Sequence, residues 1–262
     1  MTQGRFSCPK GGSAKLTKII FKIAGLELLV IFFFTLNGAY VTMTNPLNPM
    51  MQYIGVVPLA IMIALYLTFK KKWKDYFSFE KSKISPLLYS PLLLVLLIIL
   101  VGNNGLNTAE SASNFFLILI SQLFIIAFIE EMVFRGFMMN ILLAKGFKTA
   151  VIITSLLFAL THSLQLLGGQ SLEETLIQIS YAFVVGMTLS LLIVNGQSLV
   201  VAIVFHGINN FLQMSSPDSE GSYILSCVII TILLVYAIIL WRRAVKQEGA
   251  SSKISGKIDS YL

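Results

Sequence analysis

The sequence predicts an all-α protein, a bundle of about eight membrane-spanning helices. Of its 262 residues, 56% are hydrophobic and only 12% are charged, whereas a soluble domain carries about 25% charged residues. Apolar runs of roughly 20 residues, the length that crosses a bilayer as a helix, recur along the chain. The basic residues fall on one side of these runs only. We therefore expect a multi-pass membrane protein.

The apolar runs place the expected helices in order. They cover residues 19–41, 53–69, 86–102, 114–142, 149–167, 175–194, 198–214 and 222–241. Seven spans is the alternative count. The run 114–142 is longer than a bilayer requires, so we expect it to tilt, bend or leave the membrane at one end. The first run lacks a small-residue cleavage signature, which indicates an uncleaved span rather than a signal peptide.

The lysines and arginines predict that both termini are cytoplasmic. If the N-terminus is inside, the inner segments and the inner end of the first span hold every Lys and Arg except Arg135, and the outer loops hold none. This asymmetry follows the positive-inside rule and fits an even number of spans. We expect a basic N-terminal tail at 1–18, a transmembrane domain at 19–241 with its motif-bearing core at about 114–212, and a cytoplasmic tail at 242–262.

The net charge of +7 is explained by topology and by attraction to anionic lipid, so we expect no nucleic-acid partner. Cys8 and Cys227 are too few and too differently placed to predict a disulfide framework or a zinc knuckle.

Charged residues stand inside one of the most apolar stretches, FIEEMVFRGF at 128–137. Each such group opposes membrane insertion by roughly 2.5 to 3.5 kcal/mol. On a helix, Glu131 and Arg135 are spaced i, i+4 in the favourable order and can form an ion pair. Glu130 points about 100° away from Glu131 and has no such partner on its own helix. The stretch therefore divides into a structural pair and a candidate general base.

Both histidines of the chain, His162 and His206, also lie inside apolar runs, and Asn210 shares a helical face with His206. Counted from the cytosolic ends, Glu130 and the histidines fall in the middle or cytosolic part of the bilayer. Each group alone has a structural explanation, as a packing histidine, an ion pair or an amide between helices. Their joint occurrence favours convergence of the carboxylates, imidazoles, arginine and amide on one polar cavity.

The segments EEMVFR, FALTH and HGINN fit the motifs E-E-x-x-x-R, F-x-x-x-H and H-x-x-x-N in that order. Together they resemble the CPBP family (CAAX proteases and bacteriocin-processing proteins, also called the Abi family), whose members are similar to the Rce1-type CAAX prenyl protease. The resemblance covers about residues 114–212. It implies that Glu130 and His162 activate water, that His206 and Asn210 stabilise the oxyanion, and that Glu131 and Arg135 support them.

The family carries a metalloprotease label, which raises the question of a metal. Glu130, His162 and His206 are adequate Zn²⁺ ligands, yet the compact H-E-x-x-H arrangement is absent and no cysteine lies among them. The resemblance implies a glutamate that acts without metal. We expect no cofactor and keep zinc as the alternative.

The predicted function is that of an intramembrane endopeptidase, a hydrolase acting on a membrane-associated protein or peptide precursor. CAAX-type tails and peptide pheromone or bacteriocin precursors are both open as substrates. A non-hydrolytic membrane scaffold or immunity protein with a membrane-protein partner is the alternative, and a transporter is a third possibility because intramembrane carboxylates also mark ion paths. A Lys-rich, Arg-poor chain favours a bacterial source, and hence the bacterial cytoplasmic membrane.

Overall fold

The computed structural model describes residues 13–77, 86–217 and 223–259, and every regular element within them is helical. The chain is a polytopic helical bundle, so the predicted fold class is confirmed. Most of the predicted N-terminal tail, with Cys8, and the lysines Lys81 and Lys83 lie outside the described residues.

Each of the eight predicted runs falls on helix within the described residues. Five helical stretches are long and apolar enough to cross a membrane, and three apolar helices are shorter. The number of spans stays a prediction. The long stretches are Leu16–Thr44, Ala112–Lys145, Phe147–Gly168, Leu172–Val194 and Tyr223–Gly249, and the shorter helices are Val57–Phe69, Ser90–Gly102 and Leu199–Met214.

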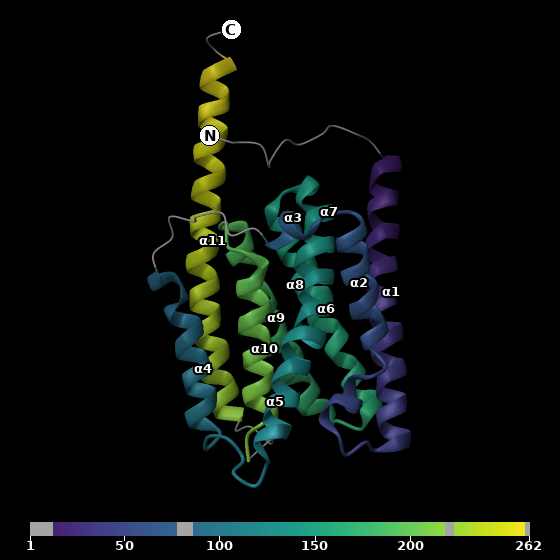
Figure 1. The fold of residues 1–262 in the computed structure, drawn as a ribbon. Helices are drawn as coiled ribbons and strands as arrows, with labels where there is room; N and C mark the ends of the chain where they lie inside the picture. Colours follow the sequence, from purple (N-terminus) through teal and green to yellow (C-terminus); the bar gives the residue numbers. More distant parts are fainter. Residues whose placement is uncertain (1–12, 78–85, 218–222, 260–262) are drawn as a thin grey trace.

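The first half of the chain forms the outer helices. Helix α1 is the least buried of the long helices, and a short 3₁₀ turn leads from it into α2. Helix α3 follows α2 at the same end of the bundle as the start of α1, and α4 runs back (Figure 1). The bounds are α1 Ser13–Thr44, η1 Pro49–Tyr53, α2 Val57–Phe69, α3 Trp73–Phe77, η2 Pro86–Tyr89 and α4 Ser90–Gly102.

The long run expected at 114–142 is an irregular helix. Regular α turns alternate with two π-helical segments, η3 and η4, in which hydrogen bonds run from i to i+5 and each turn holds more residues. The pieces are α5 Ala112–Ser121, η3 Gln122–Ala127, α6 Phe128–Glu131, η4 Met132–Met138, α7 Met139–Leu142 and η5 Leu143–Lys145. The two glutamates therefore occupy a single α turn with a π segment on either side.

The second half of the chain forms the centre of the bundle. Helix α9 is the most buried long helix and packs against α8 and α11, while α10 packs against η3. Helix α11 continues past the predicted end of its span at 241 as one uninterrupted helix. The bounds are α8 Phe147–Thr161, η6 His162–Gly168, α9 Leu172–Val194, α10 Leu199–Met214 and α11 Tyr223–Asp259.

Glycine allows α10 to approach η3 closely. A Cβ atom at Gly207 would lie 2.6 Å from Leu123 Cδ2 and 3.0 Å from Leu123 Cα, closer than a side chain and a backbone tolerate. Gly207 follows His206 directly, so this approach holds His206 near the helix that carries Glu130 and Glu131. The candidate site thus lies where two apolar clusters meet, one around Ile129 and Met132 and the other around Phe205.

Candidate active site

The predicted ion pair is present and fully buried. Arg135 Nη1 donates to Glu131 Oε1 at 3.0 Å, and neither side chain has exposed area. The guanidinium also lies 4.1 Å from the centre of the Phe158 ring, a cation–π contact from α8. A Cβ atom at Gly186 of α9 would stand 3.0 Å from Arg135 Nη2 and 3.1 Å from the Phe158 ring, so α9 comes close to both groups. Three helices therefore enclose this arginine.

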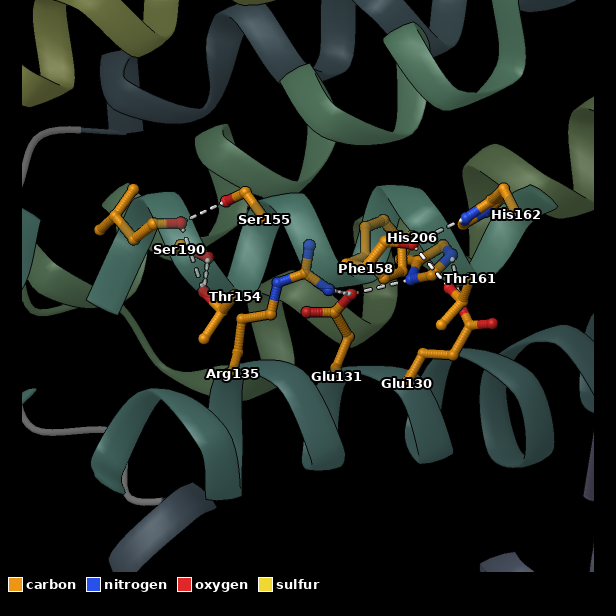
Figure 2. Close-up of polar contacts among 11 residues, drawn as sticks. Glu130, Glu131, Arg135, Thr154, Ser155, Phe158, Thr161, His162, Ser190 and His206 are labelled. Carbon is orange, nitrogen blue, oxygen red and sulfur yellow. Dashed lines mark hydrogen bonds and ion pairs between the residues drawn. The ribbon is translucent and has the colours of Figure 1, made fainter. Parts of the chain in front are cut away.

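His206 of α10 connects the two glutamates. Its Nδ1 lies 2.8 Å from Glu131 Oε1, and its Nε2 lies 3.4 Å from Glu130 Oε2 (Figure 2). A carboxylate paired with arginine only accepts, so His206 Nδ1 is the donor to Glu131. In the neutral ring, Nε2 then carries the lone pair and faces Glu130. A proton can be held at Glu130 Oε2 or at His206 Nε2.

His162 is the first residue of η6, directly after α8. Its Nδ1 lies 2.9 Å from the Phe158 carbonyl oxygen, to which it donates. In the neutral ring this leaves Nε2 as an acceptor, suited to orienting a water molecule. Within the described residues, no hydrogen bond or ion pair joins His162 to Glu130, although the resemblance pairs them. The imidazole that faces Glu130 directly is that of His206.

Asn210 of α10 is held by an amide from the π segment. Its Nδ2 donates to Gln122 Oε1 at 3.2 Å, and Gln122 Nε2 donates in turn to the Tyr53 hydroxyl at 2.8 Å. Gln122 is 2% exposed. The bond uses one of the two hydrogens on Asn210 Nδ2 and leaves the other free to donate elsewhere. This network fixes which way the Asn210 amide points.

All four residues predicted to be catalytic line one cavity of about 900 Å³, namely Glu130, His162, His206 and Asn210. The two residues predicted to support them, Glu131 and Arg135, lie behind this lining. The cavity therefore brings together a carboxylate, two imidazoles and an amide, which are the group types needed for a general base and oxyanion donors.

Sequence reasoning missed two residues of this site. The Phe158 ring contacts the guanidinium of Arg135 and lies 5.0 Å from the His162 ring and 5.6 Å from the His206 ring, centre to centre. Phe158 opens the F-x-x-x-H motif, so the motif itself pointed to it. Gln122 is a polar residue inside an apolar run, and that contrast was a visible signal as well.

The alternative zinc ligands Glu130, His162 and His206 are not arranged as a metal site. Among the described residues, no three His, Cys, Asp or Glu side chains are grouped so that they could hold a metal ion. The described side chains therefore do not form a ready set of zinc ligands.

A scan against protein-family models matched the central segment of the chain. Residues 112–212 match the model of Rce1-like type II CAAX prenyl endopeptidases. The family recognised from the three motifs is thereby confirmed over this range. The Rce1-like segment covers less than half of the chain, yet it runs from the start of α5 almost to the end of α10 and contains all six predicted site residues. A search of curated proteins found no match. The family supports intramembrane proteolysis of the CAAX-endopeptidase type.

The two glutamates should respond differently to loss of charge. Glu131→Gln leaves Arg135 buried without a counter-charge, which costs roughly 3 to 5 kcal/mol, so abundance in the membrane and the melting temperature in detergent should fall. Glu130→Gln should retain both quantities near the wild type and lose turnover instead. Equal loss of abundance in both variants would contradict this division.

Gln122 should act as a positioning residue for Asn210. Gln122→Leu removes the acceptor of Asn210 Nδ2, so kcat should fall by about 10- to 100-fold with little change in KM. Asn210→Ala in the Gln122→Leu background should add little further loss, because the amide is already misplaced. Gln247→Leu, on the exposed part of α11, is the matched control. Independent, multiplicative losses would rule out the coupling.

Proposed function

We propose that the chain is an intramembrane endopeptidase that hydrolyses a peptide bond in a membrane-associated protein or peptide precursor. One observation carries the proposal: Glu130, His162, His206 and Asn210 line a single cavity inside the Rce1-like segment. Both CAAX-type tails and pheromone or bacteriocin precursors fit this general activity. The lipid bilayer, most simply a bacterial cytoplasmic membrane, is its setting.

In the proposed mechanism Glu130 is the general base. It removes a proton from a water molecule that His162 orients through Nε2, and the resulting hydroxide attacks the scissile carbonyl carbon. The carbonyl oxygen becomes an oxyanion, which accepts hydrogen bonds from His206 Nε2–H and Asn210 Nδ2–H. On collapse of the tetrahedral intermediate, the proton held by Glu130 passes to the leaving amine nitrogen.

The buried ion pair suits His206 to the donor role. To donate through Nε2 while Nδ1 donates to Glu131, the ring has to carry both protons and a positive charge. Glu131 lies 2.8 Å from that ring and supplies a negative charge. Arg135, 3.0 Å from the same carboxylate oxygen, holds Glu131 in this position. Glu131 and Arg135 therefore support catalysis without touching the substrate.

Replacement of the base tests the proposal. Glu130→Ala and His162→Ala should each reduce cleavage by about 10²- to 10⁴-fold, the range of general-base assistance, while the protein remains in the membrane. The measurement compares the membrane peptides of cells expressing each variant. Glu248→Ala, an exposed carboxylate on α11, is the control. If either variant still cleaves at the wild-type rate, the catalytic assignment of that residue is wrong. If Glu130→Ala fully rescues a deletion phenotype and binds the same partner, the result favours the scaffold alternative.

Metal dependence is tested separately. With Glu130 acting directly on water, the purified protein should contain well under one zinc per chain and keep its activity after exhaustive chelation. The control is a known zinc protease treated in parallel. Stoichiometric zinc, with activity lost on its removal and restored on its return, would replace this mechanism and make Glu130, His162 and His206 the candidate ligands.

A further inference from the structure

The catalytic cavity extends along the bundle, parallel to α1. Its lining follows α1 from Val30, which is 1% exposed, to Met43, which is 85% exposed. At 1.5 Å per residue this stretch is about 20 Å long. The cavity therefore runs from the middle of α1 to the C-terminal end of that helix.

Two other elements that line the cavity, η6 and α10, have exposed lining residues at the same end of the bundle. The lining includes Leu167 near the end of η6 and Met214 at the end of α10, and both side chains are exposed. By contrast, Glu130 and His206, deeper in the cavity, are 7% and 4% exposed. The mouth is thus formed where α1, η6 and α10 finish, and the catalytic side chains lie below it.

The basic residues lie at the opposite end of the bundle. Lys74 belongs to α3, Lys145 to the end of the irregular helix and Arg242 to the second half of α11. Helix α3 and the second half of α11 lie toward the end of the bundle at which α1 begins (Figure 1). At the mouth end, the described connections and the adjoining first turns of the helices carry acidic charge only, as at Glu110 and at Glu173 in the first turn of α9. Under the positive-inside rule the basic end is cytosolic. The mouth then faces the extracytoplasmic side.

The lining beyond the catalytic groups is rich in amides. The lining includes Gln52, Gln165, Gln178 and Gln213, and none of the described lining residues is Lys or Arg. Amides both donate and accept, which suits the N–H and C=O groups of an extended peptide. The cation that the proposed mechanism places in the cavity is His206, which already lies against Glu131 and Glu130. A free C-terminal carboxylate would therefore find no unengaged cation in the described lining and would approach Glu130, so its burial is unfavourable.

We propose that the cavity receives its peptide from the extracytoplasmic side and cuts it at an internal bond. This inference rests on the proposed endopeptidase function and narrows its substrate class. It favours exported or membrane-inserted peptide precursors whose cleavage site reaches the outer face. A C-terminal tail presented from the cytosol would meet the basic end of the bundle instead.

Cysteine accessibility in intact cells tests the direction of the mouth. In a full-length background with Cys8→Ser and Cys227→Ser, single cysteines are introduced by Gln165→Cys and Gln213→Cys at the mouth, and by Lys74→Cys and Lys145→Cys at the basic end. A membrane-impermeant maleimide should label the first two in intact cells, and the last two only after permeabilisation. Labelling of 74 or 145 in intact cells, or of 165 and 213 only after permeabilisation, overturns the proposal.

A peptide library tests the substrate class. Internally quenched peptides of mixed sequence are given to the protein in proteoliposomes, each sequence with either a free or an amidated C-terminus close to the cut. Amidated forms should show kcat/KM at least about tenfold higher, because the described lining offers no lysine or arginine to the carboxylate and His206 is already engaged by the two glutamates. Equal or faster cleavage of the free acids contradicts the proposal. If no peptide is cut beyond the Glu130→Gln control, the endopeptidase assignment fails, while the labelling pattern still decides the side of the mouth.

Discussion

The side chains of Glu131 and Arg135 are charged and have no exposed surface, so their charges have to be compensated inside the bundle. The neighbouring helices supply the groups that do so. Removing an ion from water costs several kcal/mol, which a pair recovers only in good geometry with further contacts. Phe158 supplies a ring face, Gly186 supplies space, and His206 supplies a second donor to the same carboxylate oxygen. The interactions that neutralise the pair also fix the imidazole that faces Glu130.

Much of this arrangement depends on residues close together in the chain and could be predicted from the sequence. Hydropathy locates helices because a bilayer demands long apolar segments. The spacing of Glu131 and Arg135 gives their pairing, since residues four apart share a helical face. The presence of both histidines in apolar runs, together with Asn210, points to the cavity that they line. The three ordered motifs identify the family of the central segment.

The remaining features depend on contacts between distant parts of the chain. Spacing cannot say that His206, rather than His162, lies 3.4 Å from Glu130, because that distance is set by how α10 packs on η3 and α6. The bond from Gln122 to Tyr53 joins residues 69 positions apart. Whether a segment is α- or π-helical is likewise decided by its neighbours: the approach of Gly207 to Leu123 occurs beside the π segment η3.

The two π segments have a consequence for how this helix can change in evolution. A π turn accommodates residues in excess of those in a regular α turn. If one residue were lost between Gln122 and Ala127, the backbone could close into ordinary α turns, and the turns on either side would keep nearly the same orientation because the π turn had absorbed the extra residue. The same loss from a regular α-helix would rotate everything before it by about 100° relative to Glu130. The π segments therefore let this helix lose a residue with the change confined to the side chains of the π turn itself.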